Sequence, residues 1–228
     1  MMTDKRISLD ARLTTLAEMV GKVQSFADVG CDHGRLGAYL LQRGWVQRAW
    51  FGDISDVSLE KARRLVRMLG YEQNASFWIG DGLNGLSDSV NAIVISGMGG
   101  DTIAGILARG QARIGSARLL LGANVGHPEL RGHLCATGFR IVDERVVVDH
   151  KRCYVLIEAV RGVQKLTDFE REIGPVLCRT PSPERNIWRA FRIRVAKKAL
   201  DGAIRGNDRA EINRLKSELE IWEALDFK

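Results

Sequence analysis

The chain has 228 residues, 45% of them hydrophobic and 27% charged, and a formal net charge of +6. It is too apolar for a disordered chain, and its length suits one sizeable domain with a small appendage or two small domains. No apolar run approaches the roughly 18 residues of a membrane-spanning helix, and the first residues lack the apolar core of a secretion signal. The basic excess favours a polyanionic partner, because Lys and Arg release counterions from phosphate. We therefore expect a cytoplasmic protein that does not bind membranes.

Four cysteines are scattered without any C-x-x-C pair: Cys31, Cys135, Cys153 and Cys178. Such residues are expected to be reduced thiols in the cytosol. A zinc site built from His133, His150 and the cysteines near them is the less favoured alternative, because these pairs fall on a predicted helix and at the start of a predicted strand. We therefore expect no bound metal.

Strand-like and helix-like segments alternate along the first 160 residues. The spacing of apolar residues predicts a first helix over residues 8–20, with Ser8 as its N-cap. Short apolar runs ending in turns predict strands at residues 25–30, 49–53, 75–79, 92–95 and 118–121. Helical periodicity predicts helices at residues 36–41, 56–69, 101–109 and 127–136. Two final strands, at residues 140–148 and 153–160, are joined by so short a turn that they must be antiparallel. This order predicts an α/β fold with a mainly parallel, doubly wound, Rossmann-like sheet.

The pattern changes after Gly162. Two stretches, residues 184–200 and 208–225, carry apolar residues at helical spacing and are separated by a short glycine-containing loop. Such a pair predicts an antiparallel helical hairpin. We therefore expect two domains, a cofactor-binding domain over residues 1–162 and a helical, coiled-coil-like domain over residues 163–228.

The turn after the first strand indicates the kind of cofactor. Gly30 allows a tight turn and the close approach of a ligand, and Asp28 and His33 flank it. In dinucleotide-binding folds this turn reads G-x-G-x-x-G and carries a pyrophosphate. Here Asp32 replaces the second glycine and places a carboxylate where the pyrophosphate would sit. S-adenosylmethionine has no phosphate and carries a sulfonium and an ammonium group, so it suits Asp28 and Asp32.

Two further carboxylates follow the next strands. Asp53 can accept both hydroxyl groups of a ribose, and Asp81, beside Gly82, can accept from the exocyclic amine of adenine. Ile54 and Leu83 are expected to sandwich the adenine ring. Because the carboxyl ends of parallel strands meet at one edge of the sheet, these side chains should share one site with Asp28.

The fourth strand ends in another glycine-rich turn, residues 96–100. Gly97 and Met98 are expected to approach the methionine part of the cofactor and the incoming acceptor. Asn124, just beyond the fifth strand, should face the same edge and hold an acceptor base. We assign Asp32 and Asn124 as catalytic candidates that orient the acceptor rather than act as bases.

The chain resembles the bacterial tRNA (adenine(22)-N1)-methyltransferase family. The resemblance rests on the Gly-x-Asp-His turn at residues 30–33 and the Gly-Met-Gly-Gly turn at residues 97–100, and it covers about the first 160 residues. It implies a class I methyltransferase sheet, a C-terminal helical hairpin that helps to bind tRNA, and methylation of adenine N1. Members usually show Gln-Pro-Asn where this chain has residues 122–124 as Gly-Ala-Asn, and Ala-Tyr-Leu-Pro where it has Gly-Arg-Leu-Gly at residues 34–37. These departures lie near the acceptor pocket and leave the target base open.

A tRNA acceptor requires a basic surface. The candidates are basic residues on the helix at residues 184–200 and on the first helix: Arg185, Arg189, Arg192, Lys197 and Arg12. Lys5, Arg6, Lys151 and Arg152 are possible additions. Three alternatives stay open: a methyltransferase that acts on another RNA base, one that acts on a small molecule or protein, and a non-catalytic RNA-binding relative.

Overall fold

A single seven-stranded sheet forms the centre of the computed structural model, which describes residues 6–150 and 152–225. The strand order is β3-β2-β1-β4-β5-β7-β6. Strands β1 to β5 are parallel, whereas β7 is antiparallel to both β5 and β6. The strands are β1 (Val23–Val29), β2 (Val46–Asp53), β3 (Ala75–Ile79), β4 (Ala92–Met98), β5 (Arg118–Ala123), β6 (Phe139–Asp149) and β7 (Arg152–Arg161). The predicted Rossmann-like fold class is confirmed.

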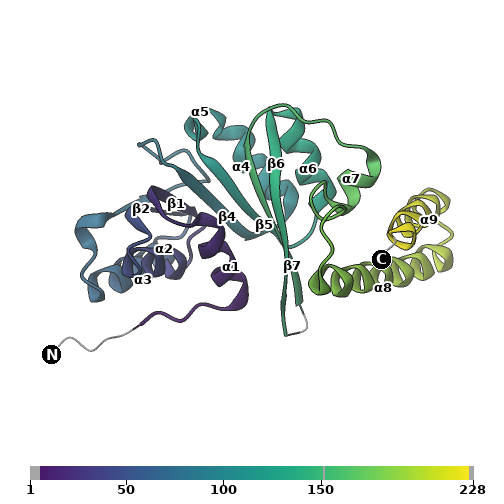
Figure 1. The fold of residues 1–228 in the computed structure, drawn as a ribbon, viewed down its shortest axis with the longest axis horizontal. Coiled ribbons are helices and arrows are strands. Elements are labelled where there is room, and N and C mark those ends of the chain that lie inside the picture. The colour runs from purple at the N-terminus through teal and green to yellow at the C-terminus, as the bar shows by residue number, and fades with distance from the viewer. Residues whose placement is uncertain (1–5, 151, 226–228) are drawn as a thin grey trace.

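Helices cover both faces of this sheet (Figure 1). Those on one face are α1 (Ala11–Val20), α2 (Arg35–Gln42) and α3 (Asp56–Met68), and those on the other include α4 (Gly100–Arg109) and α6 (His127–Ala136). Each face of the sheet carries its own hydrophobic core. Successive residues of a strand contribute to alternate cores, because their side chains point to opposite faces. Phe26 packs with α1 to α3, for example, whereas Ala27 packs with α4 and α6.

The C-terminal part of the chain adds a helical hairpin, as predicted. It consists of α8 (Pro183–Arg205) and α9 (Arg209–Ala224), and Figure 1 shows it projecting from the end of the sheet that carries β6 and β7. Trp188 of α8 and Trp222 of α9 meet edge to face with ring centroids 4.7 Å apart. Both rings are buried in the same core as α4 and α6. The division of the chain at residue 162 stays a prediction.

Several short elements were not predicted: η1 (Glu72–Asn74), α5 (Gln111–Ile114) and α7 (Asp168–Ile173). A sequence signal for α7 exists, since Thr167 and Glu170 form a capping box. The first helix begins later than expected, because the carboxylate of Asp10, rather than Ser8, accepts a 2.7 Å hydrogen bond from the Leu13 N–H. None of the helices in residues 6–150 and 152–225 is long and apolar enough to span a membrane.

A fully buried ion pair ties the hairpin connection to the sheet. Arg131 of α6 and Glu144 of β6 are 0% exposed and 2.8 Å apart. The Arg131 guanidinium also donates to the carbonyl oxygens of Arg171 and Glu172, and Glu144 accepts from the N–H groups of residues 176 and 177. A buried charge that lacks hydrogen-bond partners is costly, so a path of residues 171–177 that kept these backbone groups away from the pair would be unfavourable.

Candidate active site

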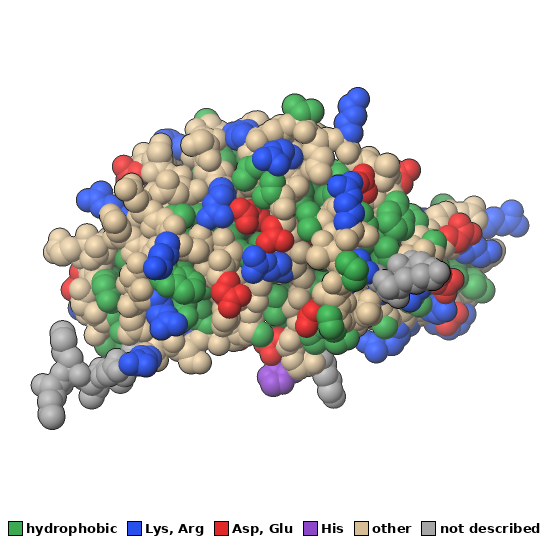
Figure 2. Space-filling model, in the orientation of Figure 1, with side chains coloured by type: hydrophobic (Ala, Val, Ile, Leu, Met, Phe, Trp, Pro, Cys, Tyr) green, Lys and Arg blue, Asp and Glu red, His purple; other side chains and the backbone are tan. Residues whose placement is uncertain are grey.

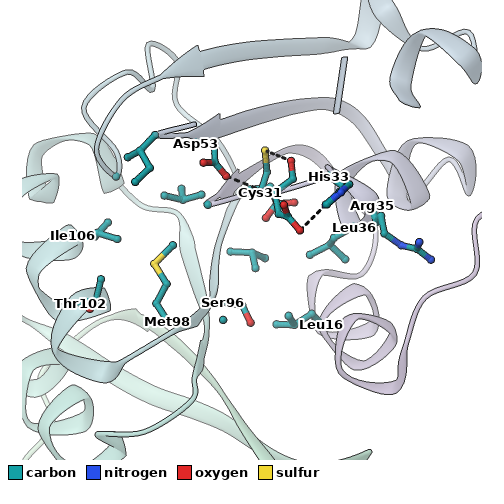
Figure 3. A pocket seen from close by; sticks show the side chains of 18 of the residues that line it. Leu16, Cys31, His33, Arg35, Leu36, Asp53, Ser96, Met98, Thr102 and Ile106 are labelled. Atoms are coloured by element: carbon teal, nitrogen blue, oxygen red, sulfur yellow. Dashed lines mark hydrogen bonds and ion pairs between the residues drawn. The ribbon is translucent and has the colours of Figure 1, made fainter. Parts of the chain in front are cut away.

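A cavity of about 500 Å³ opens at the carboxyl ends of β1, β2 and β4 (Figure 3). Its walls are formed by residues of α1 and α2 on one side, such as Leu16 and Leu36, and by Thr102 and Ile106 of α4 on the other. The volume is typical of small-molecule sites. Of the residues assigned to the cofactor from the sequence, all but Leu83 line it: Asp28, Gly30, Asp32, His33, Asp53, Ile54, Asp81, Gly82, Gly97 and Met98.

The turn after β1 is shaped by backbone geometry that favours glycine. Gly30 has a φ of 73°, and a Cβ atom on it would lie 2.3 Å from the Met98 Cε. Asp32 follows with a φ of 48°, which is uncommon for a non-glycine residue. The N–H groups of Gly30 and Cys31 both donate to the carbonyl oxygen of Gly52, which anchors the turn to β2. The floor of the cavity is therefore bare backbone where a ligand must approach closely.

Asp53 ends β2 with its carboxylate fixed by two backbone donors. Oδ2 accepts from the Asp32 N–H at 3.0 Å, and Oδ1 accepts from the Ser55 N–H at 2.9 Å. A carboxylate has about four acceptor positions, so each oxygen can still accept one more hydrogen bond. The arrangement suits two adjacent hydroxyl groups, as the sequence predicted for a ribose.

The expected adenine sandwich needs a correction. Leu83 is 1% exposed and packs in the core instead of lining the cavity, because its side chain lies over Gly110. Ile106 of α4 lines the cavity with Ile54, which is 75% exposed. Asp81 is at the same end of the cavity and forms a 2.8 Å ion pair with Arg109.

Asp28 is the buried carboxylate of the site, with 7% exposure. Burial raises the pKa of Asp28 to about 7, and the nearby carboxylates of Asp53 and Asp32 add to this, whereas the positive charge of Arg12 and a backbone N–H at Gly37 oppose it. Near neutral pH the cavity thus holds a carboxylate that a bound cation would stabilise in its charged form.

Arg12, predicted to lie on an RNA-binding surface, lines the cavity. Its Nη1 donates to the Ser96 Oγ at 2.6 Å, and its guanidinium carbon is 5.6 Å from the centre of the Tyr154 ring. The Ser96 Oγ lies only 2.3 Å from the position that a Cβ atom on Gly122 would take. Gly122, one of the departures from the family pattern, thus makes room for the hydroxyl group that holds Arg12.

Asn124 lies beside the glycine-rich turn, next to the cavity rather than in its lining. Its Nδ2 donates to the Gly97 carbonyl oxygen at 2.8 Å, and its backbone N–H donates to the Met98 carbonyl oxygen at the same distance. These two bonds orient the side chain without the proline that family members usually carry before it. The Asp32 carboxylate, also a catalytic candidate, pairs with Nδ1 of His33 at 2.6 Å.

The predicted RNA-binding face of α8 is largely engaged in protein contacts. Arg185 is 3% exposed and donates to the Leu177 carbonyl oxygen, which corrects the expectation that it faces RNA. Arg189 donates to two backbone carbonyl oxygens of α9, and Arg192 pairs with Glu172 and Glu218.

Lys197, which is 59% exposed in its side chain, pairs with Glu223 at 2.9 Å. Figure 2 shows basic and acidic side chains mixed over the projecting α8–α9 end. An RNA contact by Lys197, and by the arginines that remain partly exposed, stays a prediction. Lys5 and Lys151 lie outside the described residues. Within the described part of the chain, no group of three or more His, Cys, Asp or Glu side chains is arranged to hold a metal ion.

The family model of the methyltransferase domain matches residues 9–157. The chain belongs to this family. A tRNA (adenine(22)-N(1))-methyltransferase from Bacillus subtilis is 32% identical over 158 residues, which are 68% of this chain and 66% of that protein, just under two thirds of its length. The predicted resemblance to the bacterial tRNA (adenine(22)-N1)-methyltransferases is thus confirmed.

Two solved structures extend this likeness to nearly the whole chain. A protein of the NADB-Rossmann superfamily from Streptococcus agalactiae is 26% identical and superposes with a TM-score of 0.91, covering 98% of this chain and 99% of that one. A putative tRNA (m1A22) methyltransferase from Streptococcus pneumoniae, solved in complex with S-adenosyl-L-methionine, is 27% identical with a TM-score of 0.85, covering 96% and 99%. The helical hairpin is therefore part of the shared fold.

Sequence reasoning missed three parts of the methyltransferase site. Ile106 fits the apolar face of α4, and this pattern does not indicate that the residue also lines a cavity. Ser96 was noted only as part of a turn. Tyr154, on β7, approaches Arg12 only because β7 lies beside β5 in the sheet.

Proposed function

We propose that this chain transfers the methyl group of S-adenosylmethionine to N1 of an adenine in tRNA, at position 22 as in the name of the Bacillus subtilis relative. The observation that carries the proposal is the cavity at the carboxyl edge of the sheet, where Asp28 and Asp53 flank a bare glycine turn. The relatives support the choice of acceptor. A tRNA substrate implies activity in the cytoplasm.

The cavity fits S-adenosylmethionine on its own chemistry. Gly30 leaves open the space that a Cβ atom would fill, and Asp53 offers acceptor positions for two hydroxyl groups. Ile54 and Ile106 provide apolar surfaces for an adenine ring, with Asp81 beside them to accept from its amine. When bound, the cofactor supplies a methyl group on a positively charged sulfur.

The residues of the chain then have to orient the acceptor and exclude water. Adenine N1 carries a lone pair in the neutral base, so alignment with the methyl group accounts for much of the rate gain. Asn124 donates to Gly97 through its amide nitrogen, which leaves its Oδ1 to accept from the adenine N6 amine. That hydrogen bond strengthens as methylation makes N6 more acidic. Asp32, at the rim of the cavity, is the second orienting group.

The target adenine must leave its stack to reach the cavity, at a cost of a few kcal/mol. Binding energy from the surrounding RNA has to offset this cost. The exposed basic residues of α8, Arg194, Lys198 and Arg205, extend the candidate RNA surface beyond Lys197. A salt-dependent affinity for tRNA that falls when these residues are neutralised would support this surface.

Methylation of unmodified tRNA tests the proposal directly. Purified protein is incubated with labelled S-adenosylmethionine and an unmodified tRNA transcript that has adenine at position 22, and the product is mapped by nucleoside analysis. We expect N1-methyladenine in the wild-type reaction and none with the same transcript carrying guanine at that position. Label in another base or in a small molecule would support the alternative methyltransferases, and tRNA binding without transfer would support a non-catalytic relative.

The ribose assignment has a separate test. Asp53→Ala removes both acceptor oxygens and should abolish cofactor binding measured by calorimetry. Retained affinity would show that Asp53 does not hold the ribose.

A further inference from the structure

We propose that His127 is a positioning residue that ties the loop carrying Asn124 to the helical hairpin, so that the hairpin helps to set where the Asn124 amide meets the acceptor base. The inference rests on the proposed function, in which Asn124 orients the target adenine. His127 does not line the cofactor cavity. It acts through the backbone next to Asn124.

Asn124 is displayed by a short loop, residues 124–126, between β5 and α6. On one side of the loop, the side-chain amide and the backbone N–H of Asn124 bond to the glycine-rich turn at residues 96–100. On the other side, the Nε2 of His127, the first residue of α6, donates to the carbonyl oxygen of Ala123 at 3.1 Å. Because Ala123 and His127 flank the loop directly, this bond closes the loop that displays Asn124.

The His127 ring is a buried, neutral donor. It is 6% exposed, and since a carbonyl oxygen can only accept, its Nε2 carries the proton and its Nδ1 does not. Nδ1 is buried and has no hydrogen-bond partner among the described residues. Burial lowers the pKa of His127 to about 3, and the positive charges of Arg131 and Arg192 add to this. The ring therefore stays neutral near pH 7, and the bond to Ala123 persists.

Packing alone does not explain a histidine at this position. A buried polar atom without a hydrogen bond is destabilising, and phenylalanine would offer a ring of similar size without one. Such atoms are uncommon in native structures, so each needs a reason. Within the described part of the chain, the ring makes one polar bond, to the carbonyl group that immediately precedes Asn124. We attribute the histidine to this bond and to the loop that it closes.

The ring of His127 also contacts the hairpin. Trp188 of α8 lies edge to face with it, with ring centroids 5.9 Å apart and ring planes at 80°. Trp188 is buried and packs in turn against Trp222 of α9, whose Nε1 donates to Glu172 at 2.9 Å. Closely packed interiors transmit displacements instead of absorbing them. A displacement of α8 is therefore passed to the His127 ring and from there to the loop.

This link suits a substrate that touches both parts of the protein. An RNA that binds along α8 has to present its target base to Asn124 in a productive position, and a misplacement of about 1 Å can remove much of the rate. A loop that is positioned by the hairpin keeps the RNA contacts and the orienting amide in a fixed relation.

Two substitutions separate the two contacts of the ring. His127→Phe keeps an aromatic ring beside Trp188 and removes the donor, whereas His127→Gln keeps a donor nitrogen and removes the ring. Methylation of tRNA gives kcat and KM, and calorimetry gives the affinity for S-adenosylmethionine. We expect His127→Phe to lower kcat about 10- to 100-fold, with the KM for tRNA and the cofactor affinity unchanged. His127→Gln should recover part of the lost rate.

His133→Phe is the matched control. His133 lies on the same helix and also has a buried ring nitrogen without a partner among the described residues, but none of its side-chain atoms bonds to the loop there. Its replacement should leave kcat at the wild-type value.

Hydrogen exchange at the Asn124 backbone N–H, which bonds to the Met98 carbonyl oxygen, tests the link without RNA. NMR should show faster exchange in His127→Phe and also in Trp188→Phe, which withdraws part of the ring that faces His127. The double variant should exchange no faster than the faster single variant, because both changes break the same connection. Unchanged exchange in the central strand β1 shows that each variant keeps its fold.

Several outcomes would overturn the link. They are wild-type kcat and exchange in His127→Phe, an equal loss of kcat in His133→Phe, a loss of cofactor affinity as large as the loss of kcat, and exchange effects that add fully in the double variant. Absence of tRNA methylation by the wild-type protein alongside the expected exchange pattern would refute the proposed function and leave the link between hairpin and loop intact.

Discussion

Replacing Asp28 by asparagine should make the protein more stable while it weakens cofactor binding. Burial raises the pKa of Asp28 from 3.8 to about 7, so between these values the folded protein keeps a proton that the unfolded chain releases. Because the folded state holds more protons there, its stability falls as the pH rises from about 4 to about 7 and is constant above that. Over this pH range the free energy of unfolding falls by about 4 kcal/mol in total. Asparagine is uncharged throughout and nearly the same size, so it avoids this loss.

Urea unfolding without added cofactor, at pH 5 and at pH 8, measures the effect. The stability advantage of Asp28→Asn over the wild-type protein should be about 2 to 3 kcal/mol larger at pH 8, because most of the titration lies between these two pH values. Asp81→Asn changes an exposed carboxylate of the same cavity and should show no such increase. An Asp28→Asn variant that is no more stable than the wild-type protein, or that gains the same amount at both pH values, would refute the reasoning.

Three further predictions concern other parts of the molecule. If an ionised Asp28 holds the α-ammonium group, affinity for S-adenosylmethionine should fall up to about tenfold per pH unit below pH 7, whereas Asp28→Asn should show weak affinity without this slope in calorimetry. Gly30→Ala should lower cofactor affinity at least about tenfold, because its methyl group would lie 2.3 Å from the Met98 Cε and would displace that side chain, which lines the cavity. Gly70→Ala has a similar φ but open space around it and lies outside the cavity, so it should keep the wild-type affinity; an equal loss in both variants would contradict this. Glu144→Ala leaves Arg131 buried without its partner and should lower the free energy of unfolding, measured with urea, by about 3 to 5 kcal/mol. Glu60→Ala removes one partner of an exposed ion pair with Arg64 and should lower it by less than about 1 kcal/mol; equal losses in the two variants would contradict the prediction.

The strands, and the edge of the sheet where the predicted cofactor residues meet, could be predicted well from the sequence because both depend on local patterns. Each buried strand ends in a turn with glycine or aspartate, and parallel strands bring their carboxyl ends together whatever the register. The positions of Asp28, Asp53 and Asp81 in one cavity follow from that rule alone.

Other features depend on contacts between distant segments. Arg12 reaches Ser96 across 84 positions of sequence, so its spacing on α1 could not show that it faces the cavity. The basic residues of α8 were interpreted as a surface, but the acidic and backbone partners of Arg189 and Arg192 come from α7 and α9. A charge pattern on one helix cannot show which of its faces another helix will cover.

The buried pair of Arg131 and Glu144 affects the order in which the chain can fold during synthesis. All seven strands have left the ribosome once residue 161 has emerged. The backbone groups that complete the hydrogen bonding of this pair belong to residues 171–177, which follow later. Until these residues have emerged, the two buried charged side chains lack part of their hydrogen bonding. A nascent chain that stops short of residue 177 therefore has a less stable sheet than the finished protein.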